Sequence, residues 1–346
     1  MFRIKFTEKP NEPQKLLREF IGNPIEEFSD MFDRFFNFYG IKILLADDEL
    51  HKRPLKLKEE RTCSFCKATY GENEKFKSLA HLFPSLIGNA NLFSDFECDN
   101  CNNLFAHYEN HLANFLGAAR AINMENVKSG ALKFKSPDKT FIIEKDDESE
   151  IPKLRFESHE LENDHFTLDA ENKKITFHTI RHSYNPHKVW KSFLKMGLSI
   201  LPEDYVDDYE LAFAILRAKR KNEEKDNPLY KMNMYLHPGP SFPSPMAILF
   251  ERKNYENLIP MHIACIMFHN YTYQLVLPFS KQDKHLYNGK TLITIPNMPP
   301  FIDKHFAEKF GIPKEHRLNF NLDEMKKNEK QDITFSFEDH TDTRLE

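Results

Sequence analysis

Glycine is scarce in this sequence, and long apolar runs are absent. Ten of the 346 residues are glycine, less than half the usual share of about 7%, which excludes collagen-like and Gly/Ser low-complexity chains. No run of about 18 apolar residues, the length that a membrane-spanning helix needs, occurs. The opening MFRIKFTEKP lacks the uninterrupted apolar core of a signal peptide. We therefore expect a cytoplasmic protein that is neither exported nor membrane-spanning.

An excess of basic charge is also missing. The formal net charge of -5 argues against a wholly basic nucleic-acid binder, because sequence-independent phosphate binding needs clustered Lys and Arg. Two local basic stretches remain. Residues 51–80 hold eight Lys or Arg against four Glu, a composition that suits either a phosphate-binding face or a solvated one. For the second stretch, made of Lys188, Lys191, Lys195 and residues 217–221, partner contact, nucleic-acid binding and plain solvation are all open.

Several common catalytic motifs are absent. The sequence contains no GxxxxGK[ST] phosphate loop, no GxSxG elbow, no HExxH helix and no GxGxxG turn. ATPase, serine-hydrolase, zincin and dinucleotide-binding functions therefore lack their usual residues.

Phenylalanine is abundant, with 32 residues, and 40% of the chain is hydrophobic. This is enough for a sizeable Phe-rich core, and the length favours two domains. Within residues 24–39, Phe28, Phe32, Phe35 and Phe36 recur at helical spacing, which predicts a helix with a core or subunit face.

The remaining pattern predicts a mixed α+β chain without internal repeats. Alternation and Pro or Asn punctuation indicate strands, whereas spacings of three and four residues indicate helices. We expect a strand at 2–6, a linker or exposed hairpin at 136–153, antiparallel strands over 154–182, helices from Pro186 and over 203–221, a β-rich stretch at 232–300, and a charged mobile tail at 323–346.

Four of the five cysteines form two CxxC pairs, Cys63/Cys66 and Cys98/Cys101, separated by 31 residues. In a reducing compartment this spacing is typical of a zinc site, with four thiolates about 2.3 Å from one Zn²⁺. Four Cys ligands leave no open coordination position, so we expect the zinc to be structural. Cys265 lies in the apolar run MHIACIMF, where a buried, inert thiol is expected.

The segments beside the cysteines predict a strand, a loop and a helix. KFKSLAHLFPSLIG has the pattern of a strand entering a Pro-bent loop, which places His81 at the end of the strand. The second CxxC runs directly into NNLFAHYENHLANFL, whose apolar residues recur at helical spacing. A metal-binding turn that leads into a helix fixes the start of that helix, and hence the position of Asn102.

These residues resemble a known family. A CxxC, an alternating segment that ends in His before an apolar-Pro step, an Asn-Leu pair and a CxxCN that opens a helix are similar to HNH endonucleases of the zinc-bearing ββα-metal, or treble-clef, type. Phage Holliday-junction resolvases of the endonuclease VII kind and many bacterial HNH proteins share this motif. The resemblance covers residues 61–117, about a sixth of the chain.

The resemblance implies a role for three residues. His81 matches the general base, which takes a proton from the water that attacks the phosphodiester. Asn91 matches the Asn that braces the loop around the base. Asn102 matches the position that binds a catalytic divalent cation, Mg²⁺ or Mn²⁺. The alternatives are a structural histidine for His81, a turn residue for Asn91 and a helix N-cap for Asn102.

One position departs from the family. Many members have Asp, Glu or His directly before the base as a second ligand of the catalytic cation, whereas this chain has Ala80. Asp95, Glu97 and Asp99 follow in the loop as alternative ligands, and the sequence does not distinguish among them.

We therefore predict three segments: an N-terminal strand and Phe-rich helix at 1–60, a zinc-bearing HNH nuclease domain at 61–117, and a larger α+β domain at 118–346 that binds a regulator, partner or substrate. The expected function is metal-dependent endonucleolytic cleavage of DNA, with RNA left open. By analogy, the chain is expected to act as an effector of bacterial antiphage defence or restriction. The alternative is a catalytically silent zinc module that binds nucleic acid or a protein partner. A defence-system partner and homo-oligomerisation both remain open.

Overall fold

The structure is a computed structural model that describes most of the chain and shows both helices and antiparallel sheets, which confirms the general α+β class. The described residues are 25–47, 55–71, 75–122, 126–127, 130–131, 133–137, 139, 141–146, 153–158, 166–218, 227–254, 258–286 and 295–336.

The chain divides into two compact units. Unit 1 combines Met1–Glu109 with Pro186–Asp323, and unit 2 combines Asn110–Asn185 with Glu324–Glu346. This division differs from the predicted segments. Residues 61–117 cross from unit 1 into unit 2, and residues 118–346 contribute to both.

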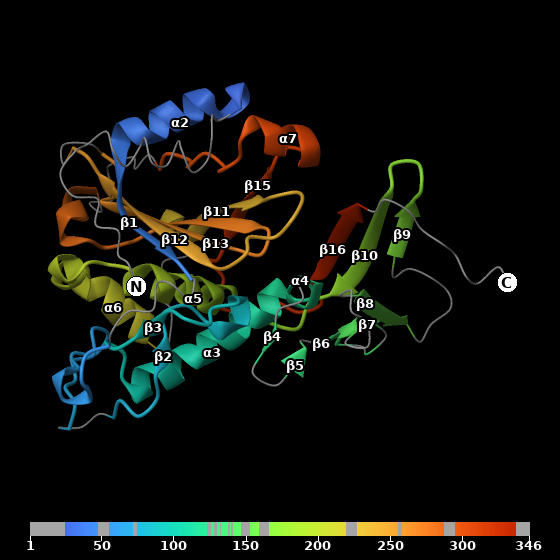
Figure 1. Cartoon of the computed structure of the whole chain (residues 1–346). Helices are drawn as coiled ribbons and strands as arrows, with labels where there is room; N and C mark the ends of the chain where they lie inside the picture. The colour runs from blue at the N-terminus through green and yellow to red at the C-terminus, as the bar shows by residue number, and fades with distance from the viewer. Residues whose placement is uncertain are drawn as a thin grey trace. The chain divides into compact units, whose positions relative to one another are not determined.

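A six-stranded antiparallel sheet forms the centre of unit 1 (Figure 1). Strand β13 is buried along its whole length, so its alternate side chains enter two different cores. In sheet order the strands are β1 (Tyr39–Ala46), β12 (Met246–Arg252), β13 (His262–Phe268), β14 (Tyr271–Val276), β11 (Lys231–Leu236) and β15 (Lys314–Asn319).

Helix α2 (Glu26–Phe38) covers one face of this sheet. The Phe residues at helical spacing form its buried side, as the sequence predicts: Phe35 meets Phe250 edge to face at 5.0 Å and stacks on Tyr39 at 5.1 Å. Ile263, Cys265 and Met267 of β13 belong to the same core. Cys265 is therefore a fully buried core residue, as expected.

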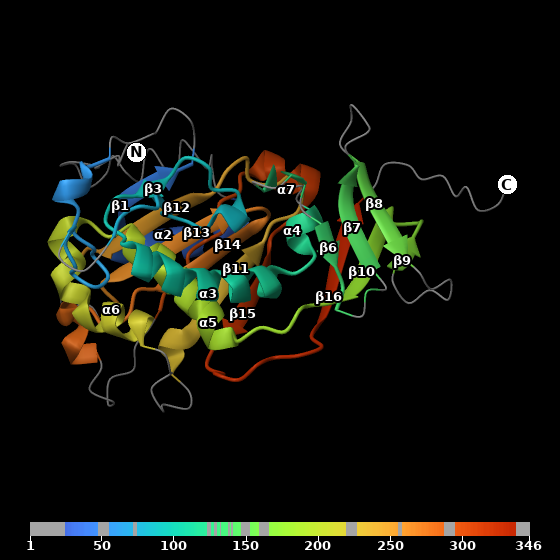
Figure 2. The same cartoon turned by 90° about the horizontal axis from the view of Figure 1, so that it is seen from below.

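Helix α5 (Pro186–Ser199) packs against the opposite face of the sheet and is buried along nearly its whole length (Figure 2). Phe193 lies 4.5 Å from Tyr273 between ring centroids. At Gly197 the helix comes so close to the sheet that a Cβ atom would lie 2.5 Å from Cδ2 of Leu277. Next to α5 in sequence come a 3-10 segment, η4 (Glu203–Tyr209), and helix α6 (Glu210–Arg217).

The cysteine-bearing segment packs on these helices through aromatic contacts. Phe65 meets Phe213 of α6 at 5.6 Å, and the Tyr108 hydroxyl donates a hydrogen bond to the Leu216 carbonyl. Its elements are η2 (Lys58–Glu60), β2 (Ala80–His81), η3 (Ser85–Ile87), β3 (Phe93–Ser94) and α3 (Asp99–Leu116). The other elements of unit 1 are η5 (Pro228–Tyr230), η6 (Lys281–Leu286) and α7 (Lys304–Phe310).

Unit 2 contains two three-stranded antiparallel sheets, one short hairpin and helix α4 (Ala119–Ile122). Phe134, Ile143 and Phe177 form its core together with Ala118, Ala121 and Ile122. The sheets are β6 (Lys133–Lys135), β7 (Phe141–Asp146) and β8 (Lys153–Ser158), then β16 (Lys330–Ser336), β10 (Lys174–Ile180) and β9 (Phe166–Asp169), and the hairpin is β4 (Asn126–Val127) with β5 (Gly130–Ala131).

Some of the predicted helices and strands are confirmed, and others are wrong. The helices at 24–39 and from Pro186, the strand pair around the Asp169 turn and the β-rich stretch at 232–300 are confirmed. The predicted helix over 203–221 is wrong in its first part, which is the 3-10 segment η4, and α6 ends at Arg217. The tail expected to be mobile contains strand β16, paired along its length with β10. The strand predicted at 2–6 lies outside the described residues.

The close approach of Gly197 to Leu277 leads to a testable prediction. In an exposed helix Gly→Ala stabilises by about 1 kcal/mol, but here the added methyl meets Leu277 and overpacking costs about 1–3 kcal/mol. We expect Gly197→Ala to lower the urea-unfolding free energy by about 1–2 kcal/mol. In the Leu277→Ala background, which removes the clashing methyl, the same change should cost less. A stabilising Gly197→Ala would show that this helix-sheet contact is not tightly packed.

Candidate metal centre

The four cysteines of the two CxxC pairs come together in the structure. Their Sγ atoms all lie within 4.8 Å of one another, and those of Cys66 and Cys98 are 3.7 Å apart. Two sulfurs bound to one tetrahedral zinc at about 2.3 Å are about 3.8 Å apart. The donor set and its spacing are therefore compatible with structural zinc, as the sequence predicts. Within the described part of the chain, this is the one group of three or more Cys, His, Asp or Glu close enough to hold a metal ion.

The first pair lies in a tight turn whose backbone folds around the sulfurs. Lys67 donates its N–H to the Cys63 carbonyl at 2.7 Å, and Cys63 donates to the Ala68 carbonyl at 2.8 Å. Lys67 has φ of 64°, a left-handed conformation that favours glycine. The Ser64 N–H reaches the Phe96 carbonyl at 2.9 Å, which joins the first turn to the chain just before the second pair.

Electrostatics in the cluster favour a cation. A hydrogen bond from the Cys101 thiol lowers the pKa of Cys63 to about 5, whereas burial raises the pKa of Cys98 to about 12. Four thiolates at this spacing repel one another, so they cannot all ionise without a positive charge among them. A divalent metal ion such as zinc would supply that charge.

The second pair begins helix α3, and Asp99 fixes this helix start to the approach of β2. The Asp99 carboxylate accepts hydrogen bonds from the backbone N–H groups of Lys77 at 3.1 Å and Ser78 at 3.0 Å. In return, the Asp99 N–H donates to the Lys75 carbonyl at 2.8 Å. Three residues after Ser78 comes His81, and three after Asp99 comes Asn102. Three hydrogen bonds of Asp99 thus couple the backbone segments that carry both predicted site residues.

His81 ends strand β2, as predicted, and is partly exposed. Its partner across the hairpin is Phe93, and the two rings lie 4.8 Å apart between centroids. Strands β2 and β3 have only two residues each. The position of His81 therefore depends on contacts beyond the strand ladder.

Asn89, which the sequence analysis did not single out, makes the hydrogen bonds that brace the loop after His81. Its buried amide donates to the carbonyls of Phe83 at 2.6 Å and Leu92 at 2.9 Å, and its oxygen accepts from the Leu92 N–H at 3.0 Å. Asn91 contributes its backbone N–H instead, to the carboxylate of Asp47 at 2.9 Å. These contacts show that the side chain of Asn89 braces the loop, and the role that the resemblance implies for Asn91 stays a prediction.

Asn102 lies in the first turn of α3, partly exposed, with its backbone N–H on the Cys98 carbonyl at 2.9 Å. The three acids considered as companion ligands are engaged elsewhere. Asp95 accepts the Lys56 N–H at 2.9 Å, Asp99 binds the Lys77–Ser78 backbone, and Glu97 pairs with Lys195. Ala80 is buried, so its position contributes only a methyl group to the core.

Glu97 and Lys195 form a buried ion pair beside the cluster. Their charged atoms are 3.2 Å apart, and both side chains are almost completely inaccessible. Burial raises the pKa of Glu97 to about 7, although Lys195 acts in the opposite direction. Burial also raises the pKa of Glu109, which lies close enough to Lys195 to feel its charge. The local sequence pattern does not predict this arrangement, because Lys195 is remote along the chain.

The described residues of the two basic stretches do not form a continuous phosphate-binding face, and residues 51–54, 72–74 and 219–221 lie outside the described part of the chain. In the first, Lys56 pairs with Glu203 at 3.1 Å and Lys67 with Asp207 at 3.0 Å. In the second, Lys191 and Lys195 are buried in the core and point to backbone carbonyls. Lys75 and Lys77 stay exposed next to the strand that carries His81.

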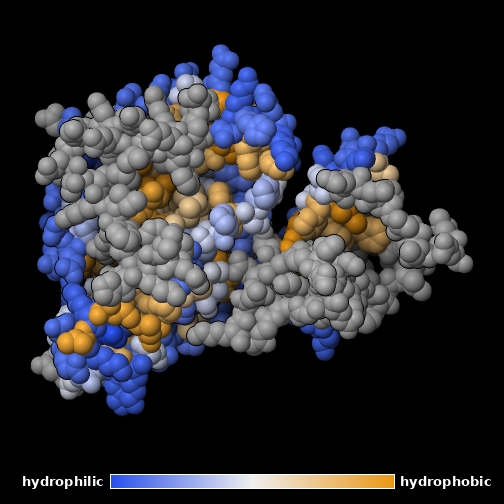
Figure 3. Space-filling model, viewed as in Figure 1, coloured by the Kyte–Doolittle hydropathy of each residue, from blue (hydrophilic) through white to orange (hydrophobic). Residues whose placement is uncertain are grey.

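Apolar residues also reach the surface in the cysteine-bearing segment. They gather at the lower left of Figure 3. Leu57, Tyr70 and Leu79 are exposed large hydrophobic residues of this segment.

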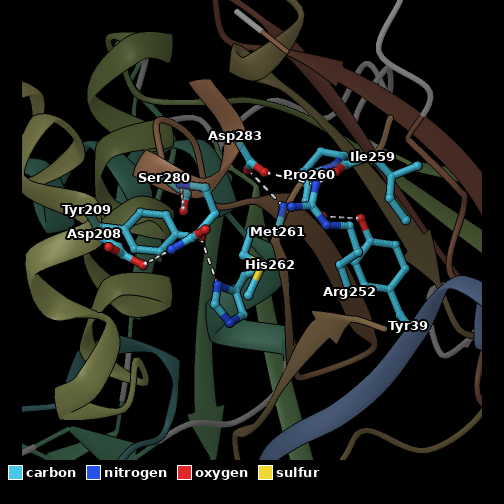
Figure 4. A network of polar contacts seen from close by, with 11 residues as sticks. Tyr39, Asp208, Tyr209, Arg252, Ile259, Pro260, Met261, His262, Ser280 and Asp283 are labelled. Carbon is cyan, nitrogen blue, oxygen red and sulfur yellow. Dashed lines mark hydrogen bonds and ion pairs between the residues drawn. The ribbon is translucent and has the colours of Figure 1, made fainter. Parts of the chain in front are cut away.

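A second network of buried polar groups lies at the end of strands β12 and β13 (Figure 4). Arg252 and Asp283 form a fully buried ion pair at 3.1 Å, and Asp283 also accepts the Met261 N–H at 2.8 Å. His262 shares a hydrogen bond of 2.9 Å with the Tyr209 hydroxyl, and burial lowers its pKa. These groups are closed off from solvent and hold loop backbone, so we assign them a structural role.

No protein-family model, curated protein or solved structure matches the chain. Among the described residues, no helix combines the length and apolar character required to cross a bilayer.

Metal analysis tests the cysteine cluster. We expect about one zinc ion per purified chain and near-complete loss of zinc in Cys98→Ser, because structural zinc contributes folding free energy through all four thiolates. The matched control is Cys265→Ala, which removes the fifth cysteine from the sheet core and should retain the zinc. A metal-free but stably folded parent would contradict the zinc assignment.

Substitution of the two loop asparagines tests which one braces the loop. Asn89→Ala removes the amide donor from the Phe83 carbonyl and the acceptor from the Leu92 N–H, while the Leu92 carbonyl keeps the Leu82 N–H, and it should lower the unfolding free energy by about 2–4 kcal/mol. Asn91→Ala keeps the backbone bond to Asp47 and should change it by less than about 0.5 kcal/mol. The reverse order, measured by chemical denaturation, would restore the sequence-based assignment.

Proposed function

We propose that this chain is a metal-dependent endonuclease of the HNH type that hydrolyses phosphodiester bonds in DNA. The observation that carries the proposal is the position of His81. It ends the first strand of a short hairpin whose entry is hydrogen-bonded to the start of α3, and that helix begins at the second cysteine pair.

The order of elements supports the same proposal. A cysteine turn is followed by a two-stranded hairpin and then by a helix that carries the second cysteine pair. This is the order of a zinc-bearing ββα-metal module, and in that arrangement the metal rather than a large core fixes the hairpin to the helix. The resemblance of the sequence and the order of the elements thus point to the same module.

In the proposed reaction, the His81 imidazole takes the proton from a water molecule as that water attacks the phosphorus. A neutral imidazole suits this task because its ordinary pKa lies near neutral pH. The carboxamide oxygen of Asn102 would hold a divalent cation, Mg²⁺ or Mn²⁺. When bound, such a cation neutralises the scissile phosphate and stabilises the leaving oxygen.

Cation binding by the protein alone should be weak. Ala80 offers no ligand atom, and Asp95, Glu97 and Asp99 are occupied by backbone or by Lys195. Mg²⁺ commonly keeps several waters and uses one or two protein ligands together with the substrate phosphate. The DNA itself would then complete the site.

The surroundings of His81 also favour a second candidate function. With a buried alanine beside the proposed base and every nearby acid engaged, the module also fits a catalytically silent zinc domain that binds nucleic acid or a protein partner. In either case, the rest of the chain would control when the module acts, as in an effector of bacterial antiphage defence.

A cleavage assay with matched variants separates the two functions. The zinc-loaded parent is incubated with plasmid DNA over a range of Mg²⁺ and Mn²⁺ concentrations. We expect His81→Ala to reduce the cleavage rate at least about 100-fold at every concentration, because it removes the general base. Asn102→Ala should instead shift the dependence on Mg²⁺ to higher concentrations, because it removes a cation ligand.

The control variant is His178→Ala, which alters an exposed histidine of unit 2 that is hydrogen-bonded to Asp332 and Thr167. It should cut like the parent. Cleavage that survives His81→Ala would exclude the proposed base, and DNA binding without cleavage by the zinc-loaded parent would favour the silent module.

A further inference from the structure

Lys195 of helix α5 contacts the hairpin that carries His81. Its Nζ donates to the His81 carbonyl at 2.6 Å and to the Leu82 carbonyl at 3.3 Å, and lies 3.2 Å from the Glu97 carboxylate. An ammonium group has three N–H donors, and here three acceptors surround it. The side chain is 2% exposed, so water does not compete for these bonds.

The two carbonyls belong to consecutive residues, and this has a geometric consequence. Each peptide unit is planar, so the two bonds hold the peptide planes on either side of the Leu82 Cα atom, and the first of these planes also contains the Cα atom of His81. The pairing of Ala80 with Ser94 and of His81 with Phe93 restrains the peptide plane on the other side of His81. Together these contacts limit the directions in which the His81 side chain can leave the backbone.

The same ammonium also reaches the metal centre. Glu97 directly precedes Cys98, so its pairing with Lys195 connects the second cysteine turn to the backbone of His81. The Lys195 and Glu97 charges stabilise each other, because burying either charge without its partner would cost free energy.

Helix α5 is a rigid support for this contact. It is packed against the six-stranded sheet through Phe193 and through the close approach at Gly197. A group held by such an element is positioned more precisely than one held by a loop.

We propose that Lys195 is a positioning residue for phosphodiester hydrolysis: with Glu97 as its counter-ion, it holds the His81 backbone so that the imidazole points at the attacking water. This inference rests on the proposed nuclease function and extends the machinery to a helix outside residues 61–117.

A double variant separates positioning from charge pairing. Lys195→Met alone leaves the Glu97 carboxyl group buried without its cation, which destabilises the fold and confounds any loss of activity with misfolding. Lys195→Met combined with Glu97→Gln removes both charges and should restore most of the unfolding free energy. The carbonyls of His81 and Leu82 still lack the ammonium, so the positioning defect should persist.

The matched control is Lys191→Met. Lys191 lies one turn earlier on α5, is equally buried and donates to the Ala218 carbonyl instead of the hairpin. Zinc content and the urea midpoint are measured for all proteins before any activity is compared.

We expect the double variant to keep its zinc and to bind DNA within about twofold of the parent when no Mg²⁺ is added. Its cleavage rate at saturating DNA and Mg²⁺ should fall about 10- to 100-fold, the effect of a misplacement of the base by about 1 Å. Lys191→Met should cut at the parental rate. Parental cleavage by a folded, zinc-loaded double variant would overturn the proposal.

A failure of the nuclease proposal would be recognised separately, because the parent itself would then not cut. The positioning claim is in that case decided by NMR of protein labelled with ¹⁵N-histidine, in which the His81 ring signals are assigned by their loss in His81→Ala. Displaced His81 signals in the double variant, with unchanged ones in Lys191→Met, support the claim. Unchanged signals in both refute it.

Discussion

The convergence of four cysteine sulfurs is the constraint on which the proposed site depends. The described residues between 55 and 98 form only short regular elements, two strands of two residues and single 3-10 turns, so their backbone hydrogen bonds alone cannot define a shape. The sulfurs bring the two ends of this segment together, and Asp99, Asn89 and Asp47 then fix its interior through side chain to backbone bonds. The hairpin is therefore a product of tertiary bonds rather than of strand propensity.

Two buried ion pairs hold segments of unit 1 together, and one of them connects the cysteine module to helix α5. Lys195 faces Glu97, and Arg252 faces Asp283, in both cases with side chains almost wholly removed from solvent. Such pairs contribute little net stability compared with an apolar core, but breaking one is costly. Their effect is to fix which backbone segments lie together. For Lys195 these are the helix that covers the sheet and the strand that carries the candidate base.

The sequence predicted best what is encoded locally. The Phe residues of α2 and the apolar positions of α5 recur at helical spacing, and the two CxxC pairs have the spacing of a metal site. Strand β16 was missed because its charged residues concealed the alternation of Gln331, Ile333 and Phe335. Ile333 and Phe335 pack on the core of unit 2, and the Gln331 amide donates to the Leu116 carbonyl. At η4 the acidic run had a helical composition, but the chain adopts the tighter 3-10 form.

The parts of the site that escaped prediction are those with no local pattern. Lys195 and His81 are 114 residues apart in the chain, and nothing near either residue announces their contact. The choice between Asn89 and Asn91 had a local basis, since both lie in the same short loop, but it depends on which side chain turns inward. Neither the pattern nor the resemblance contains that information.

The unequal burial of the four sulfurs suggests how the metal would leave. Cys63, Cys98 and Cys101 are buried, whereas Cys66 is partly open to solvent. A chelator or oxidant arriving from outside therefore meets the Cys66 thiolate first, and the neighbouring Lys67 is already in a conformation unfavourable to its side chain. Loss of the metal should thus begin at the turn that carries Cys66. The exposure of this turn would then determine how long the metal centre survives under oxidative stress.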